Sequence, residues 1–306
     1  MSGLLGTLRP RPCPVCGSTD DGDVFAEQHI DEAALDAFAF ASRKRPEQMR
    51  LRLVTCPVCD LVYANPVPDA DRLAAAYEEA AFDSAEEARF AAATYAEITR
   101  GLLDRLPDRD GAIDIGTGEG AFLSELLDLG FTNVAGIEPS SEPIAAADPR
   151  VAGLIEHDVF RADVRPPESQ SLITCFQTIE HVHDPSALVR DAAAQLKPGG
   201  ILLLVCHDRE APINRALGVR SPIVDIEHMQ LFSKRSAGEL LLRGGLERPT
   251  MRPIRNRYPI RYWARLVPLP DAVHGPLTTT LERSGVAGRS LTVPVGNLAV
   301  WGFKPA

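Results

Sequence analysis

The stretch Ala112 to Gly130, AIDIGTGEGAFLSELLDLG, decides the fold. Its first four residues predict a short buried strand, and the glycines at 116, 118 and 120 predict a tight turn. From about Ala121 the apolar residues recur at helical spacing, which predicts an amphipathic helix. Glycines let the backbone approach a ligand closely, and the start of a helix offers N–H groups to a polar or anionic group. The stretch therefore predicts a binding turn for a nucleoside-like ligand.

Two nucleotide-binding patterns fit this turn. Gly116-x-Gly118-x-x-Ala121 satisfies the loose dinucleotide pattern, whereas Asp114-x-Gly116-x-Gly118-x-Gly120 resembles motif I of the class I S-adenosylmethionine (SAM)-dependent methyltransferases. The carboxylate of Asp114 would repel a pyrophosphate close by, so it favours the second pattern. Glu138 ends the next expected strand, where either fold places an acid on ribose hydroxyls. A glycine-rich turn that binds nothing is the alternative.

The first 69 residues contain two Cys-x-x-Cys pairs, Cys13 with Cys16 and Cys56 with Cys59. Four thiolates in two short loops suit tetrahedral zinc, and a closed four-sulfur site leaves no open position for catalysis. We therefore predict a structural zinc ribbon over residues 1–69, with a partly helical insert over Glu27–Arg50. Disulfides are poorly supported in a cytosolic protein, and His29 is expected on the surface.

The rest of the chain divides at residue 106. Residues 70–106 are rich in alanine with helical periodicity, which predicts a helical cover from which Tyr77 and Tyr95 could reach an active site. Residues 107–306 alternate strands and helices, the pattern of an α/β, Rossmann-like domain with a parallel sheet. The expected strands are 112–115, 133–137, 154–156, 171–176 and 201–205, and the expected helices are 121–129, 141–147 and 186–196, the last stopped by Lys197-Pro198-Gly199-Gly200.

Ligands of open parallel sheets lie beyond the carboxyl ends of the strands. This rule selects one set of candidate site residues: Asp114, Glu138, Asp158, Gln177 to His181, and His207.

The resemblance to class I methyltransferases extends through residues 95–206. IDIGTGEG, IEPS, EHDVF, FQTIEHVHDP and LKPGGILLLV occur in the order and spacing of that family. The resemblance implies a seven-stranded sheet with helices on both faces, completed by an antiparallel hairpin of 250–255 and 297–303. It also implies a SAM site, with the glycines at 116, 118 and 120 against methionine, Glu138 on the ribose and Asp158 on the adenine amino group. We count Asp114 and Gln177 with these cofactor-binding residues.

A narrower resemblance concerns both ends of the chain. A four-cysteine ribbon ahead of this fold, with Glu227-His228 before Leu231-Phe232-Ser233, is similar to the sugar C-methyltransferases of antibiotic biosynthesis. Those enzymes often carry an aromatic residue just before the Glu-His pair and a longer C-terminal domain. Here Val224-Asp225-Ile226 precedes the pair. The resemblance implies a natural-product or nucleotide-sugar acceptor.

Histidines are the candidate general bases, since an acceptor that carries a proton must lose it. We place His228 first, because Glu227 and Asp225 are close enough in sequence to influence its protonation and because the wider resemblance falls there. His181 comes second, with His207 third, and His183 is also in a plausible place. From a keto sugar His228 would remove a proton α to the carbonyl; from a hydroxyl it would take the oxygen's proton.

Composition limits the partners. The net charge of −10 and the pI of about 5.2 argue against nucleic acid, and the absence of a long apolar run or a secretory signal makes us expect a cytoplasmic protein without a membrane partner. One segment differs: between Arg243 and Arg265 lie seven arginines and a single acid, Glu247. They indicate either a solvated face or an anion site for a phosphate-bearing acceptor. Cys175 and Cys206 are expected to be buried.

Three other functions compete with methylation of a small metabolite. Some ribosomal RNA methyltransferases carry a zinc ribbon before this fold, but the acidic pI and Gln177-Thr178-Ile179-Glu180 in place of a base-methylation motif disfavour that function. A non-catalytic interaction module is disfavoured by the intact glycine turn and the acids at 138 and 158. A nicotinamide-dependent oxidoreductase is disfavoured by Asp114.

Overall fold

The computed structural model describes residues 8–31, 49–78, 85–266, 280–281, 283–284 and 286–306, and its centre is a seven-stranded sheet. The strand order is β12-β13-β10-β9-β6-β7-β8. Strands β6 to β10 are parallel, and β13 runs antiparallel between β10 and β12. The strands are β6 (Asp110–Ile115), β7 (Thr132–Glu138), β8 (Ile155–His157), β9 (Gln170–Phe176), β10 (Leu196–His207), β12 (Glu247–Pro259) and β13 (Ser290–Phe303). The expected α/β class and the C-terminal antiparallel hairpin are both confirmed.

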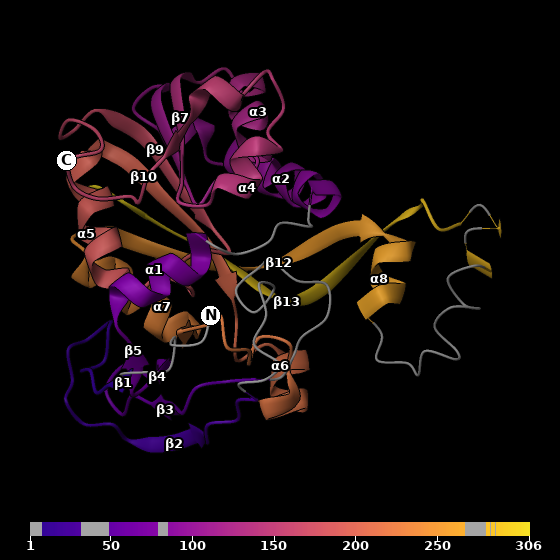
Figure 1. The fold of residues 1–306 in the computed structure, drawn as a ribbon. Helices are drawn as coiled ribbons and strands as arrows, with labels where there is room; N and C mark the ends of the chain where they lie inside the picture. The colour runs from indigo at the N-terminus through magenta and orange to yellow at the C-terminus, as the bar shows by residue number, and fades with distance from the viewer. Residues whose placement is uncertain (1–7, 32–48, 79–84, 267–279, 282, 285) are drawn as a thin grey trace.

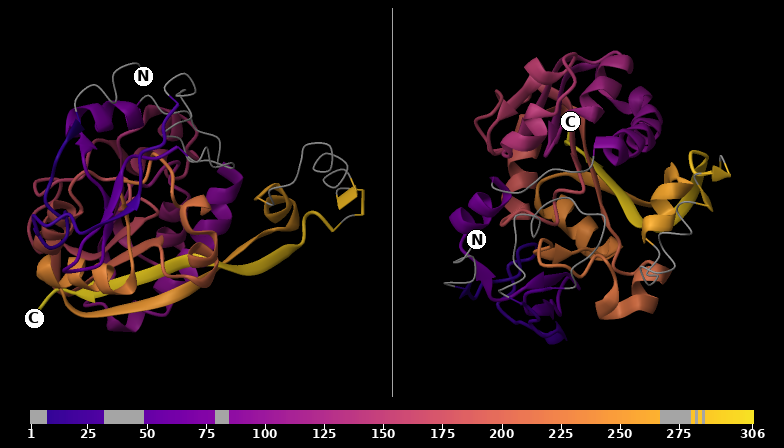
Figure 2. Two further views of the ribbon diagram at one scale, coloured as in Figure 1. Left: turned by 90° about the horizontal axis from the view of Figure 1, so that it is seen from below. Right: turned by 45° about the vertical axis from the view of Figure 1, so that its right-hand side comes forward.

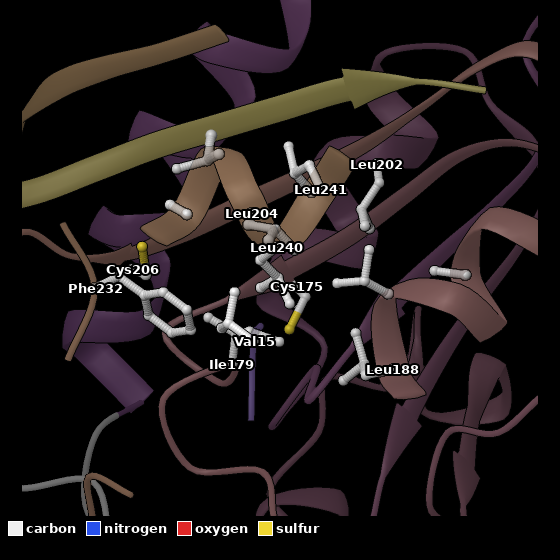
Figure 3. Close-up of a cluster of buried hydrophobic side chains, with 14 of the residues drawn as sticks. Val15, Cys175, Ile179, Leu188, Leu202, Leu204, Cys206, Phe232, Leu240 and Leu241 are labelled. Atoms are coloured by element: carbon white, nitrogen blue, oxygen red, sulfur yellow. The ribbon is translucent and has the colours of Figure 1, made fainter. Parts of the chain in front are cut away.

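Helices cover both faces of this sheet (Figure 1). The helices of the described residues are α1 (Ala70–Glu78), α2 (Ala85–Arg100), α3 (Ala121–Asp128), α4 (Ser141–Ala145), α5 (Pro185–Gln195), α6 (Pro212–Leu217), α7 (Lys234–Arg243) and α8 (Ile260–Leu266), with 3-10 turns at Leu103–Arg105, Ala152–Leu154 and Gly218–Arg220. On one face, α2 and α3 pack against the alternating apolar residues of the strands. On the other face, α5 and α7 pack together with the N-terminal ribbon. Figure 3 shows Val15 of the ribbon beside Ile179, Phe232 and the leucines of α7.

The junction of α5 and β10 differs from the expectation. Asp184 caps α5 by accepting a hydrogen bond from the Ala187 N–H, and Pro185 occupies the first turn. The helix ends at Gln195, and Leu196 already pairs with Gln170 of β9. The segment LKPGG therefore forms the start of β10 and not a separate turn before this strand. The pairing with β9 shifts register between Leu196 and Ile201. Pairing with the neighbouring strand outweighs the turn preference of Pro-Gly-Gly.

The N-terminal ribbon has a four-stranded sheet of order β11-β4-β3-β2. Three strands come from the ribbon itself and the fourth from much later in the chain: β2 (Asp23–Ala26), β3 (Leu53–Thr55), β4 (Val62–Ala64) and β11 (Gln230–Leu231). The short strands β1 (Leu8–Arg9) and β5 (Val67–Pro68) pair beside it. Within the expected helical insert, residues 32–48 lie outside the described residues, while His29 and Arg50 at its ends pair as an antiparallel bridge.

The hydrophobic core of the ribbon is closed by a later part of the chain. Leu53, Val62 and Met49 pack in one cluster with apolar residues from the segment 223–231. These later residues are Ile223, Val224, Ile226, Met229 and Leu231, and each is at most 6% exposed. The ribbon and the segment before β11 therefore share one buried interior.

The last two strands extend beyond the sheet as a two-stranded arm that carries α8 (Figures 1 and 2). The arginine-rich segment, residues 243–265, includes the end of α7, the strand β12 and most of α8. Arg243 pairs with Glu239, Arg248 pairs with Glu247, and the Arg252 guanidinium lies over the Trp301 ring. The side chain of Arg265 lies outside the described residues. No helix among the residues described is both long and apolar enough to cross a lipid bilayer.

Candidate active site

The glycine turn lies at the carboxyl end of β6 and needs its glycines for separate reasons. All three have positive φ, between +57° and +78°. A Cβ at Gly116 would lie 2.4 Å from Thr178 Oγ1, so no side chain fits there. At Gly118 no atom lies within 4 Å of the same position, so the backbone here borders open space. The turn therefore leaves room for a ligand beside Gly118.

The N–H groups of this turn are mostly used within the protein, contrary to the expectation that they stay open for a ligand. Gly116 N–H donates to the Ile137 carbonyl at 2.8 Å, and Gly120 N–H donates to the Thr117 carbonyl. Gly118 N–H donates to Glu138 Oε2 at 2.8 Å, and Ser140 N–H donates to Oε1. These bonds hold the carboxylate at the end of β7 against the glycine turn. Burial raises the pKa of Glu138.

Asp158, the residue implied for the adenine end, follows β8. Its N–H donates to the Glu138 carbonyl at 3.2 Å, which places the two acids on adjacent strand ends. Its carboxylate is partly exposed and accepts hydrogen bonds from Arg161 and from the Val159 N–H. The Arg161 guanidinium lowers the pKa of Asp158. The structure therefore brings Asp114, Glu138 and Asp158 to one edge of the sheet, in the order of β6, β7 and β8.

Asp114 is buried inside this edge. It is 3% exposed, and its carboxylate accepts a hydrogen bond from the Thr174 hydroxyl at 2.6 Å. Burial raises the pKa of Asp114 to about 7, because the charged form loses its hydration. A cationic ligand beside this residue would stabilise the carboxylate.

Three of the candidate histidines meet in one cluster. The ring centroids of His181 and His228 are 4.8 Å apart, and those of His207 and His228 are 5.1 Å apart. His207 ends β10, His181 lies in the loop after β9, and His228 lies just before β11. Burial lowers the pKa of all three, that of His181 to about 4, so each imidazole is neutral at pH 7.

The hydrogen bonds of these rings define their tautomers. His228 Nδ1 lies 2.9 Å from the Ile223 carbonyl, which can only accept, so Nδ1 carries the proton and Nε2 carries the lone pair. His228 Nε2 lies 3.9 Å from Glu227 Oε1. His181 donates in the same way to the Glu227 carbonyl, and its ring also hydrogen-bonds to the backbone of Gln177. Two backbone partners make His181 better suited to orienting the loop than to accepting a substrate proton.

His207 is held by a chain of amides from the C-terminal hairpin. Its Nδ1 lies 2.8 Å from Asn297 Oδ1 on β13, and Asn297 Nδ2 donates to Asn256 Oδ1 on β12. Asn256 Nδ2 in turn lies 3.4 Å from the Tyr258 hydroxyl. Since Asn297 presents its carbonyl oxygen, His207 also carries its proton on Nδ1. The sequence analysis missed both asparagines, because each lies within a strand and belongs to no recognisable motif.

Glu180 belongs to the stretch Gln177 to His181 that the sequence analysis selected, although no role was predicted for it. Its side chain is fully buried, and Oε1 accepts the His207 N–H at 2.6 Å while Oε2 has no hydrogen-bond partner. Burial raises the pKa of Glu180 to about 7. Its backbone carbonyl accepts from the N–H groups of Met229 and Gln230. Glu180 therefore links the three segments that carry the histidines.

The remaining candidates fall around this cluster. Tyr95 on α2 is buried against Phe176 with ring centroids 4.3 Å apart, whereas the side chain of Tyr77 lies outside the described residues. Gln177 has positive φ, and its buried Nε2 has no hydrogen-bond partner. His183 lies two residues beyond His181, and its carbonyl accepts a hydrogen bond from Arg11. Cys175 and Cys206 are buried in the core, as expected.

The four ribbon cysteines form a separate cluster that fits a metal ion. Their Sγ atoms all lie within 4.8 Å of one another, with Cys13 and Cys59 at 3.5 Å and Cys16 and Cys56 at 3.4 Å. Tetrahedral zinc with bonds of about 2.3 Å places its sulfurs about 3.8 Å apart. In the part of the chain that the structure describes, only these cysteines gather closely enough for a metal, and the histidine cluster does not.

Comparison with known proteins agrees with this geometry. The family described as "Methyltransferase domain" matches residues 86–248. The ubiquinone biosynthesis O-methyltransferase of Ralstonia nicotianae is 36% identical over 105 residues, and that of Marinobacter nauticus is 34% identical over 108 residues. Each match covers 32% of this chain and 44% of the relative, so the chain spans less than half the length of these curated relatives.

Two solved structures are similar to this chain. A possible histamine N-methyltransferase from Thermotoga maritima has 20% identity and a TM-score of 0.46, covering 71% of this chain and 90% of its own. The YcgJ protein from Bacillus subtilis has 17% identity and a TM-score of 0.49, covering 69% of this chain and 98% of its own. The seven-stranded sheet has the Rossmann-like order expected of the methyltransferase domain. This chain belongs to the methyltransferase-domain family.

Binding of SAM should release protons near pH 7. SAM carries a positive sulfonium and an amino group, and a cation beside Asp114 lowers a carboxyl pKa that burial has raised to about 7. Near pH 7 a fraction of the molecules then holds the proton on Asp114 before binding, so we expect a net release of protons when SAM binds. Calorimetry in buffers of different ionisation enthalpy measures this release. Equal apparent enthalpies in all buffers would contradict the prediction, and Asp114→Asn, which has no such proton, is the control.

Proposed function

We propose that this methyltransferase transfers the SAM methyl group to an oxygen or carbon atom of a small acceptor, with His228 as the general base. SAM supplies a methyl group on a sulfonium with a good leaving group, so the protein has two tasks. It must align the acceptor with the methyl, and it must remove the proton that the acceptor loses. The proton passes to His228 Nε2, the methyl forms its new bond to the acceptor, and S-adenosylhomocysteine leaves.

The observation that carries this proposal is the cluster of neutral imidazoles at the edge of the sheet that bears the glycine turn. His228 lies at its centre, in ring contact with both His181 and His207. Its Nδ1–H is fixed by the Ile223 carbonyl, which leaves Nε2 as the basic atom. Glu227 lies near enough to stabilise the imidazolium that forms when His228 takes the proton. His207, with the same tautomer, is the second candidate for the base.

The acceptor is inferred only by class. The names of the ubiquinone biosynthesis O-methyltransferases support methylation of a hydroxyl, and the Glu227-His228 resemblance to sugar C-methyltransferases supports methylation of a carbon in a natural-product or nucleotide-sugar intermediate. The same base serves both reactions. Arg255 and Arg257 are exposed on β12, where an anionic group of the acceptor could lie.

We also propose that the four cysteines hold a structural zinc ion. The donor set of four thiols and the sulfur–sulfur distances fit tetrahedral zinc, and four protein ligands leave no position for substrate. The reaction would then use no metal-bound group. Zinc would act by holding the ribbon and the segments packed against it.

Transfer of labelled methyl from SAM into a fractionated cell extract tests the proposed function. We expect the label in the filtrate that contains small molecules and not in RNA or protein. Label in RNA would instead support a zinc-ribbon RNA methyltransferase, and binding of SAM with no label in any fraction would support a non-catalytic module. Either result would overturn the proposal.

A further inference from the structure

Arg11 connects the zinc ribbon to the loops that carry two of the histidines. We propose that Arg11 is a positioning residue, which holds His181 and His228 in the geometry that makes His228 a base. The inference rests on the proposed function and deepens it, since it assigns the ribbon a role in that same site.

The contacts of Arg11 reach three separate segments. Its Nη1 donates to the His183 carbonyl at 2.9 Å, its Nη2 donates to the Met229 carbonyl at 3.0 Å, and its Nε donates to the Ala64 carbonyl at 3.0 Å. Nη2 also lies 3.3 Å from Gln230 Oε1. A planar guanidinium suits this task because its fork of donors has fixed directions, which an ammonium group lacks. One side chain thus ties the ribbon to the loop after β9 and to the segment before β11.

Both of these segments carry a histidine of the cluster. His181 precedes His183 by two residues, and His228 directly precedes Met229. The two segments are also bonded to each other, because Gln230 Nε2 donates to the carbonyls of Ile179 and Val182. The His181 bond to the Glu227 carbonyl crosses the same junction. A shift of either segment would therefore change the distance between the two rings.

The ring of His207 is held from a different part of the chain, and only its backbone N–H bonds to Glu180 in the loop after β9. His207 ends β10, and its ring is hydrogen-bonded to Asn297 of β13, a strand that Arg11 does not bond to in the described part of the chain. Loss of Arg11 should therefore disturb two histidines and spare the third. This selectivity separates positioning from a general loss of structure.

The ribbon in turn fixes Arg11. The Arg11 N–H donates to Asn65 Oδ1 at 3.0 Å, and Cys13 follows two residues later. The ribbon is also bonded to the body elsewhere: Ser186 Oγ donates to the Pro14 carbonyl, and Arg235 Nη2 donates to the Val58 carbonyl. A closed four-cysteine site can thereby influence the base without touching the acceptor.

Histidine side-chain NMR of the Arg11→Met variant tests the inference without any acceptor. The wild type should show the Nδ1–H tautomer for all three clustered histidines. In Arg11→Met we expect His181 and His228 to lose this single-tautomer signature, while His207 keeps it. Metal content and the SAM dissociation constant should stay as in the wild type. With an acceptor, kcat should fall by about 10- to 100-fold with little change in the KM for SAM, as expected for a misplaced catalytic group.

Arg9→Met is the matched control, because Arg9 lies in the same segment but pairs with Asp69 at the surface. It should leave all three histidine signatures unchanged. If Arg11→Met does not fold, Arg11→Lys provides the test. A lysine keeps the charge but cannot donate to all three carbonyls, so His181 and His228 should still lose their single-tautomer signatures. Unchanged signatures in the folded Arg11 variants would overturn the inference, and so would equal loss of all three with loss of SAM binding. Failure of the proposed function would be seen in a different experiment, as a normal rate of methyl transfer by the His228→Ala variant.

Discussion

Replacing His228 with alanine should lower the rate of methyl transfer by about 10²- to 10⁴-fold, the usual contribution of a general base. The affinity for SAM should stay within about twofold, because His228 contributes to proton removal and not to the glycine turn. Steady-state kinetics and calorimetry with SAM measure the two quantities. His228→Gln, which can still donate a hydrogen bond but cannot take the proton, should be equally inactive.

The control for this variant is His29→Ala. The His29 side chain is exposed in the ribbon, and its backbone pairs with Arg50, so the substitution should leave the rate unchanged. A near-normal rate in both His228 variants would reject His228 as the base and leave His207. The pH profile is a further check. Burial lowers the pKa of His228 well below 6.5, so the neutral form persists and the rate should fall only well below that pH.

Replacing Cys56 with serine should remove the metal and destabilise the whole protein. Structural zinc contributes about 10 to 16 kcal/mol in small zinc domains, and loss of about 5 kcal/mol would lower Tm by about 10 °C or more. The effect should extend beyond the ribbon, because Ile223, Met229 and Leu231 are buried in its core. Metal analysis and thermal unfolding measure the two changes.

Cys175→Ala is the matched control for Cys56. Cys175 is equally buried but lies in the sheet, away from the four-cysteine group, so its replacement should cost about 1 kcal/mol and leave the metal content unchanged. A Cys56→Ser protein that unfolds at the wild-type temperature would show that the ribbon does not need the metal.

The sequence was sufficient to predict the sheet and which residues meet at the carboxyl edge of its strands. Alternating strands and helices, together with Asp114, Glu138 and the glycines, indicated a parallel sheet whose ligand lies at the carboxyl ends of the strands. His181 and His207 follow two neighbouring strands, so the same rule already placed them near each other. The parallel strands and the meeting of these residues could be predicted because they depend on local periodicity and on a general property of parallel sheets.

The contacts that complete the site could not be predicted in this way. His228 reaches the cluster because β11, a strand of two residues, pairs with β4 of the ribbon, and so short a strand has no periodicity to detect. The carbonyl contacts of Arg11 leave no trace in the sequence, since any residue offers a carbonyl. The bond between Asn297 and His207 depends on the register of β13 against β10, which the composition of either strand does not specify.

The pairing of β4 with β11 also constrains how the protein forms during synthesis. The ribbon strands emerge early from the ribosome, but the residues that close their core are translated more than 150 residues later. Until then Leu53 and Val62 lack the apolar residues that bury them in the finished protein, and the four cysteine thiols belong to an incomplete sheet. Such distant pairings slow folding and expose apolar surface to aggregation. Expression at low temperature with zinc in the medium should therefore raise the yield of soluble protein.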